Sequence, residues 1–151
     1  MVVNVQNVRD GQTYKLTNAK GGTVVDLSGQ DRGAPITGYN FNGGANQKWT
    51  LEHSDSEHWR LKNQATGLFV GLDKDQPENG RKLIATDRAA EWQLRADKKD
   101  PNNVRLFLKD TQYCLDLSDN GNKQPGTPIT LWKKWDEGMN QAWMIEEGEL
   151  S

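Results

Sequence analysis

The sequence predicts an all-β fold made of three equivalent units, and two observations support that prediction. First, a short phrase recurs in each third of the 151-residue chain: Asn46-Gln47-Lys48-Trp49, Ala90-Glu91-Trp92 and Asn140-Gln141-Ala142-Trp143. Second, short runs of alternating or β-branched apolar residues lie between these phrases. Gly, Asn, Asp and Pro separate the runs, which is typical of strands joined by turns. The two patterns recur together, so they predict one structural unit copied three times.

Each unit is expected to contain four short strands in the same order. The first run alternates apolar and polar residues, the second is mostly apolar, the third carries a β-branched residue, and the fourth holds the repeated tryptophan. The expected strands cover 14–18, 23–27, 35–39 and 47–51, then 59–63, 68–72, 82–86 and 91–94, then 104–108, 113–117, 128–132 and 141–145. The stretches between them are rich in turn residues and show no sustained helical period.

Twelve short strands in three sets predict a closed or nearly closed body with approximate threefold symmetry, because closure removes exposed strand edges. The repeats are expected at about 13–53, 58–97 and 103–149, within a single domain spanning 1–151. Three units are too few to ring the channel of a propeller.

Composition excludes several function classes. The formal net charge is −2 with no basic stripe, so nucleic-acid binding is not expected. There is neither a polybasic anchor nor an apolar run long enough to cross a bilayer, so membrane insertion is not expected. Cys114 is the only cysteine and the chain start lacks a signal-peptide pattern, which favours a cytoplasmic location.

Two positions differ between the units in the same way. Asp26, Gly71 and Asp116 lie 45 positions apart, so the second unit has lost a carboxylate. Asn46 and Asn140 also share a position, which is replaced near Ala89 in the second unit. A carboxylate and an amide together suit a sugar, because they accept from and donate to neighbouring hydroxyl groups. The pattern predicts binding sites in the first and third units and a degenerate second unit.

The three units ending in Gln-Xaa-Trp or its remnant resemble a β-trefoil of the ricin B-chain lectin type, over about residues 12–149. Size and the lack of disulfides make the chain most similar to the small cytoplasmic lectins of mushroom fruiting bodies. The resemblance implies reversible binding of non-reducing galactose or N-acetylgalactosamine on glycoproteins or glycolipids, without metal or cofactor. It also implies a role in defence. A homodimer is expected, because weak single sites need avidity.

The resemblance also implies which residues bind. The family uses an Asp, an aromatic and an Asn, which correspond in the third unit to Asp116, Trp132 and Asn140. In the first unit, which is the preferred site, the set is Asp26, Tyr39 and Asn46, with the loop residues Asn40, Phe41, Asn42 and Gly43. Phe41 is expected to be exposed, and it and Trp135 are competing aromatic platforms.

Structural alternatives remain for these residues. Asp26 and Asp116 could be turn formers, and Tyr39 and Trp132 could be partly buried core residues. The repeated residues are expected to be scaffold: Trp49, Trp92 and Trp143 as core pillars, and Gln47 and Gln141 as amides that tie down neighbouring backbone.

Other function classes have less support. No catalytic or phosphate-binding motif is present, so the chain is not expected to be an enzyme. His53 and His58 are expected on a solvated turn and not at a metal site. The charged segments 73–78 and 95–100 are expected to be solvated loops. The alternative function is a β-trefoil protease inhibitor or protein-interaction module.

Overall fold

The computed structural model describes residues 1–147, so the end of the third predicted repeat lies outside the described residues. Over these 147 residues, thirteen strands join in one sheet. They are β1 (Val2–Val3), β2 (Gln12–Asn18), β3 (Val24–Leu27), β4 (Ile36–Tyr39), β5 (Trp49–His53), β6 (Trp59–Asn63), β7 (Phe69–Leu72), β8 (Leu83–Thr86), β9 (Trp92–Ala96), β10 (Val104–Leu108), β11 (Tyr113–Leu117), β12 (Thr127–Lys133) and β13 (Trp143–Glu146). The twelve expected strands are confirmed to within about two residues at each end, and β1 is additional.

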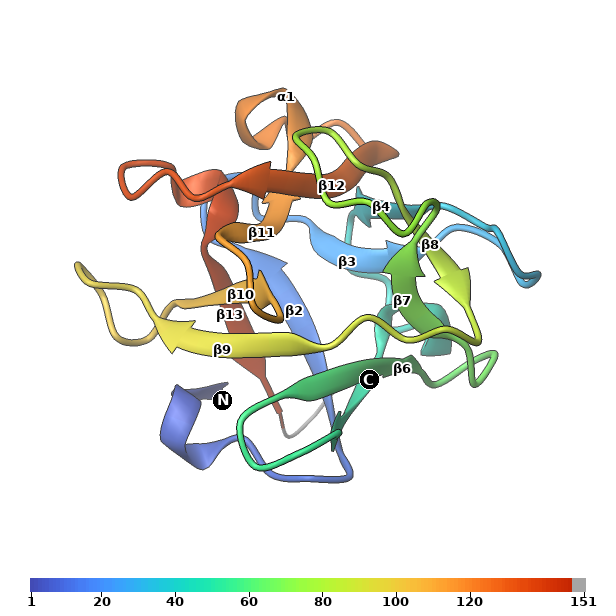
Figure 1. The fold of residues 1–151 in the computed structure, drawn as a ribbon, viewed down its shortest axis with the longest axis horizontal. Helices are drawn as coiled ribbons and strands as arrows, with labels where there is room; N and C mark the ends of the chain where they lie inside the picture. The colour runs from blue at the N-terminus through green and yellow to red at the C-terminus, as the bar shows by residue number, and fades with distance from the viewer. Residues whose placement is uncertain (148–151) are drawn as a thin grey trace.

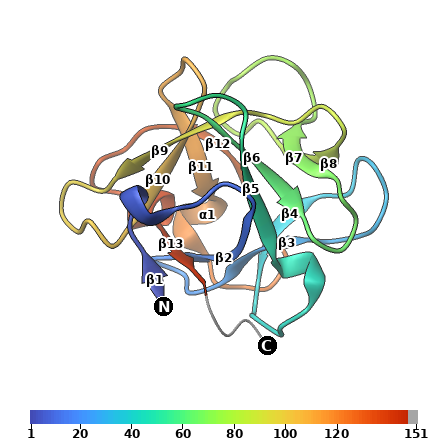
Figure 2. The same cartoon turned by 90° about the horizontal axis from the view of Figure 1, so that it is seen from below.

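Six of the strands close into a barrel. The ring runs β2–β5–β6–β9–β10–β13 and returns to β2, with every neighbouring pair antiparallel. Figure 2, seen from below, shows these strands around the centre of the molecule. Each unit contributes its first and fourth strand to this ring. The fourth strand of one unit pairs with the first strand of the next, so neighbouring units are joined by strand pairing in the barrel.

The second and third strands of each unit form a hairpin over one end of the barrel. The hairpins are β3–β4, β7–β8 and β11–β12, and they lie in the upper half of Figure 1. They also contact one another through the β4–β12 pairing and through two isolated bridges, Pro35–Ile84 and Lys82–Thr130. A six-stranded barrel capped by three hairpins is a β-trefoil, which confirms the predicted fold class.

The three repeated tryptophans begin β5, β9 and β13 and are fully buried at the join between barrel and cap. They pack with aliphatic residues from all three units in one hydrophobic core. Their predicted role as core pillars is confirmed, and a low apolar content is sufficient because the units share this core.

In the described part of the chain, helical structure is limited to single turns. Three 3₁₀ helices occur there, at η1 (Val5–Asn7), η2 (Ala45–Gln47) and η3 (Met139–Gln141), and the last two place the Asn-Gln pairs of the first and third units. The segment α1 (Ser118–Gly121) is a left-handed turn, because Asp119, Asn120 and Gly121 have φ of 53°, 54° and 79°. Within residues 1–147, no helix is long and apolar enough to cross a membrane.

Two expectations about polar loops are wrong in part. Residues 73–78 are exposed as expected, but Asp97 in the 95–100 segment is only 5% exposed because it forms an ion pair with buried Arg105. His58 is likewise buried, with Nδ1 2.9 Å from Asp55, whereas His53 is exposed and its ring packs on Trp59.

Candidate carbohydrate-binding site

The third unit brings its three predicted residues together around a pocket. Asp116 on β11, Trp132 on β12 and Asn140 in η3 all line a cavity of about 490 Å³. Trp132 is 45% exposed, so it is a surface aromatic and not a core residue. The loop after β12 adds Trp135, which is 49% exposed and also lines the pocket. Two aromatic side chains, Trp132 and Trp135, and the Asp116 carboxylate therefore line the same pocket.

Asp116 lines this pocket and is held mainly by Gln141. Gln141 Nε2 donates to Asp116 Oδ2 at 2.9 Å, and the residue is 5% exposed. Burial raises the pKa of Asp116 to about 6, against the lowering effect of hydrogen bonds from Gln141 and Asn140. At neutral pH the group is mainly ionised, and it therefore accepts hydrogen bonds without donating.

Polar atoms beside Asp116 have no partner within the described residues. Asn140 Oδ1 and Thr130 Oγ1 are buried and unpaired, and Thr130 lies directly opposite Asp116 in the β11–β12 pairing. Buried polar atoms in native proteins are nearly always hydrogen-bonded, so such a group calls for an explanation. Both oxygens belong to residues next to Asp116, and Asn140 lines the pocket with it, so the polar groups there are not fully paired within the protein.

In the first unit the equivalent carboxylate accepts more hydrogen bonds from the protein itself. Asp26 accepts hydrogen bonds from Ser28 Oγ at 3.1 Å, Asn46 Nδ2 at 3.2 Å and Gln47 Nε2 at 2.9 Å. Tyr39 is 42% exposed and lies two residues beyond Thr37, the cross-strand partner of Asp26. Side chains two apart on a strand share a face, so the tyrosine stands on the face that carries Asp26.

The loop that follows Tyr39 is fixed by Gln47. Its Nε2 donates to the Asn40 carbonyl at 2.9 Å, and its Oε1 accepts from Asn42 N at 2.8 Å. Gly43 turns the chain with a φ of 78°. The expected exposure of Phe41 is wrong: its ring is half-buried, with Lys15 Nζ 4.1 Å from the ring centre. A cation–π contact therefore holds the ring against the barrel.

The amide bridge is the same in the third unit. Gln141 Nε2 donates to the Lys133 carbonyl at 3.0 Å, and Gln141 Oε1 accepts from Trp135 N at 2.8 Å. The prediction that Gln47 and Gln141 tie down backbone is confirmed. The structure adds that each also holds the carboxylate of its own unit.

The second unit has no room for a carboxylate. A Cβ at Gly71 would come within 2.2 Å of Thr86 Cγ2 and 2.7 Å of the Arg88 carbonyl oxygen. Ala90 N donates to the Val70 carbonyl. The equivalent carbonyls of the other units, at Val25 and Leu115, accept instead from the indole N–H of Trp49 and Trp143. Trp92 Nε1 is consequently buried without a partner in the described residues. Thr86 and the Arg88 backbone therefore occupy the space that a side chain at position 71 would need.

Two asparagines that the sequence analysis did not single out complete the sites from the neighbouring unit. Asn63 Nδ2 donates to the Asn46 carbonyl at 3.0 Å, and Asn18 Nδ2 donates to the Asn140 carbonyl at 2.9 Å. Both end the first strand of a unit, where the third unit has Leu108. The missing amide would have faced the degenerate second unit. The unit that lacks this asparagine is the third, whereas the unit that lacks the aspartate is the second. The two losses match only when each unit is compared with its neighbour in the closed barrel, which the sequence alone does not show.

Cys114 lies inside β11 and is fully buried. Burial, with Asp116 nearby, raises the pKa of its thiol to about 12. The thiol therefore stays protonated at neutral pH and is not a nucleophile.

Comparisons with known proteins agree with this architecture. The family model for ricin-type beta-trefoil lectin domain-like sequences matches residues 3–86 and 45–132. A search of curated proteins found no match. Among solved structures, the ricin B-like lectin of Macrolepiota procera, in complex with lactose, is 40% identical with a TM-score of 0.87. It covers 94% of this chain and 99% of its own.

Two further structures extend the comparison. The Rhizoctonia solani agglutinin is 28% identical with a TM-score of 0.82, covering 92% of this chain and 97% of its own. The designed threefold-symmetric protein ThreeFoil is 21% identical with a TM-score of 0.81, covering 89% and 98%, and this likeness concerns the fold alone. From the family match and the Macrolepiota lectin together, the chain belongs to the ricin-type β-trefoil lectin family.

Proposed function

We propose that the protein is a non-catalytic lectin that binds terminal galactose or N-acetylgalactosamine through the first and third units. One observation carries the proposal: Asp, Asn and an exposed aromatic recur at matching positions in these two units, and the second unit has closed the space. Scaffold residues alone would have no reason to vary as a set.

The pocket of the third unit has the chemistry that a pyranose requires. Asp116 accepts from adjacent hydroxyl groups, the Asn140 amide lines the same pocket, and Trp132 or Trp135 covers the apolar C–H face of the ring. The Macrolepiota relative was solved with lactose, a disaccharide with a terminal galactose, which supports this sugar class.

Isothermal titration with lactose and with N-acetylgalactosamine tests the proposal. We expect dissociation constants between about 1 mM and 1 μM, equivalent to about 4 to 8 kcal/mol. Asp26→Asn and Asp116→Asn should each remove one site and together remove binding, while thermal unfolding stays cooperative. Glucose is the control sugar.

Two results would sink the proposal. One is an absence of galactoside binding by the folded wild type. The other is nanomolar inhibition of a protease that free sugar does not relieve, which would indicate the inhibitor alternative.

Defence through surface glycans, a cytoplasmic location and a homodimer complete the proposal. The dimer is checked by light scattering at micromolar concentration. The location is checked by fractionation of the source cells, and the defence role by feeding assays with wild-type and double-variant protein.

A further inference from the structure

A buried ion pair lies beside the third-unit pocket. Arg105 on β10 is 5% exposed, and its Nε donates to Asp97 Oδ1 at 2.9 Å. Asp97 belongs to the turn that joins the second and third units, where its Oδ2 also accepts from the Lys99 and Asp100 amides at 3.3 and 3.2 Å. The carboxylate thus ties the guanidinium to a fixed turn.

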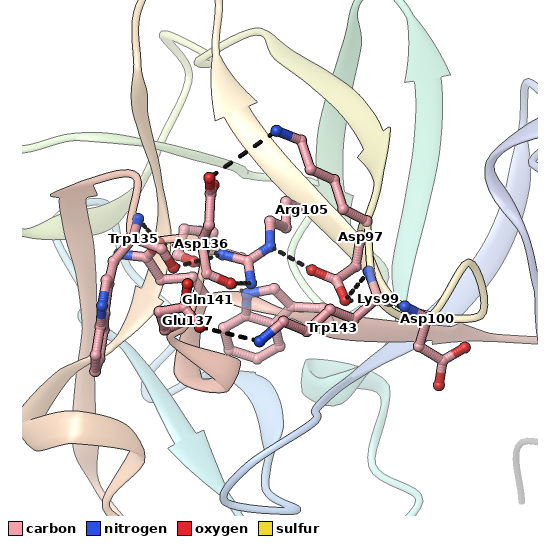
Figure 3. Close-up of polar contacts among 11 residues, drawn as sticks. Asp97, Lys99, Asp100, Arg105, Trp135, Asp136, Glu137, Gln141 and Trp143 are labelled. Carbon is pink, nitrogen blue, oxygen red and sulfur yellow. Dashed lines mark hydrogen bonds and ion pairs between the residues drawn. The ribbon is translucent and has the colours of Figure 1, made fainter.

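The remaining donors of Arg105 reach the loop that forms the rim of the pocket. Nη1 donates to the Trp135 carbonyl at 3.0 Å, and Nη2 donates to the Asp136 carbonyl at 3.0 Å. Figure 3 shows the guanidinium between Asp97 on one side and these loop residues on the other, with the Trp135 ring directed away from it. A planar fork with several fixed donors is suited to holding two adjacent carbonyls at once.

Arg105 also contacts the amide that holds the binding carboxylate. Its Nη1 lies 3.4 Å from Gln141 Oε1, and Gln141 Nε2 donates to Asp116 Oδ2 at 2.9 Å. A continuous set of hydrogen bonds therefore runs from Asp97 through Arg105 and Gln141 to Asp116.

The first unit is held differently. Lys15 holds the position of Arg105, but its ammonium lies over Phe41 and 3.9 Å from Glu146 Oε2, in a partly exposed ion pair. No bond from Lys15 to loop carbonyls is present within residues 1–147. Arg60 holds this position in the second unit and is only partly buried. Within the described residues, the buried arginine that bonds to loop carbonyls from this position is therefore Arg105. The third-unit loop is also longer by one residue between the amide-bridged positions and the Gln.

We propose that Arg105, anchored by Asp97, is a positioning residue that holds the 133–138 loop and Gln141, and so sets the affinity of the third-unit pocket alone. The inference rests on the proposed sugar binding in that pocket. Exposed bridges from Lys99 to Glu137 at 3.0 Å and from Lys98 to Asp136 at 4.0 Å join the same two segments. Exposed pairs contribute little, so the buried bonds carry the effect.

The test uses the Asp26→Asn background, in which lactose titration reports the third pocket only. The main variant is Asp97→Asn with Arg105→Met, which removes both buried charges together and keeps an acceptor for the 99–100 turn. Arg105→Lys is the second variant, because it keeps the charge but not the fork. The matched control is Arg95→Met, since Arg95 lies opposite Arg105 on β9 and contacts Gln93 and Phe107.

The double variant should raise the lactose dissociation constant at least about tenfold, because the loop then occupies its binding position only part of the time. Hydrogen exchange at the Trp135 and Gly138 amides should accelerate by at least about tenfold while that of β10 and β13 does not. Arg105→Lys should show smaller changes in the same direction, and Arg95→Met none. First-site affinity, measured with Asp116→Asn in place of Asp26→Asn, should be unchanged.

Three results overturn the inference. They are unchanged loop exchange and affinity in the folded double variant, equal weakening of both sites, and an Arg105→Lys variant identical to wild type. If the wild-type pocket binds no galactoside, the proposed function fails by itself, and exchange at Trp135 and Gly138 still decides whether Arg105 positions the loop.

Discussion

At the scale of single residues, Asp26 and Asp116 occupy the same position in different surroundings. Asp26 has three side-chain donors, whereas Asp116 has Gln141 and two unpaired buried oxygens close by. The raised pKa of Asp116 has the same cause, since its charge is removed from water with little compensation. The carboxylate of Asp116 is therefore less saturated by protein donors than that of Asp26.

We predict that galactoside affinity in the third pocket falls as the pH drops through about 6, because protonated Asp116 loses acceptor capacity. In the Asp26→Asn background, lactose titrations from pH 5 to pH 8 should show the transition. Asp119, Lys133 and Lys134 also line the pocket, and Cys114 and Arg105 lie close behind it. The Cys114 thiol, with a pKa of about 12, does not titrate in that range. A flat profile would contradict the prediction.

Asp116 should also lower stability at neutral pH. Its pKa in the folded chain, about 6, exceeds the ordinary value of 3.8, so the folded state binds this proton more tightly. The stability it contributes is therefore complete below pH 3.8 and is lost as the pH rises through 6. Asp116→Asn should raise the melting temperature by roughly 2 to 5 °C at pH 7.5 and less at pH 4, by calorimetry. An equal gain at both pH values would count against this cause.

Restoring the missing carboxylate should not restore the second site. Gly71→Asp would place a Cβ 2.2 Å from Thr86 Cγ2, so we expect a loss of about 1 to 3 kcal/mol and no third galactoside equivalent. Urea unfolding and titration stoichiometry measure the two effects, with Gly71→Ala as the control for the steric part. A stable variant with one additional site would refute the prediction.

At the scale of elements, each proposed site is contacted by the first strand of the next unit around the ring. Asn63 at the end of β6 holds the Asn46 carbonyl, and Asn18 at the end of β2 holds the Asn140 carbonyl. Both asparagines also accept from the turn that follows them, so one side chain fixes a hairpin and a neighbouring site.

We predict a crossed effect for these two positions. Asn63→Leu should weaken the first site and spare the third, whereas Asn18→Leu should do the reverse. In each case we expect roughly a tenfold loss. Leu108 already stands at the equivalent position, which makes leucine the matched replacement. Titrations in the Asp26→Asn and Asp116→Asn backgrounds separate the sites, and equal losses at both would argue for general destabilisation.

Features that recur at equivalent positions in two or three units could be predicted from the sequence, and features present in one unit could not. The strands, the tryptophan core and the Asp–Asn sets follow from comparing equivalent positions, and the structure places them as predicted. Asp97 and Arg105 could not be found that way, because they occur in one unit only and Asp97 lies in a segment of mixed charge. Burial of such a pair depends on the 133–138 loop, about 30 residues later in the chain. The exposure of Phe41 was mispredicted because Lys15 contacts it from a different strand.

At the scale of the whole molecule, the two proposed sites are carried by one closed barrel. A single weak site dissociates quickly, but two sites on a surface rich in galactose give avidity without any new contact. We predict that Asp116→Asn reduces retention on a galactose-coated sensor by at least about tenfold more than it reduces affinity for free lactose at the remaining site. Equal reductions would indicate that the sites never engage one surface together.

The closed ring has a consequence for how such a protein can be assembled. Because the asparagine of one unit is held by a side chain of the next, a free unit would present an unfinished pocket. Three separate copies of the first unit, closing the same barrel, would finish all three. A short peptide of this sequence would thus gain ligand binding by self-association, before any fusion into one chain.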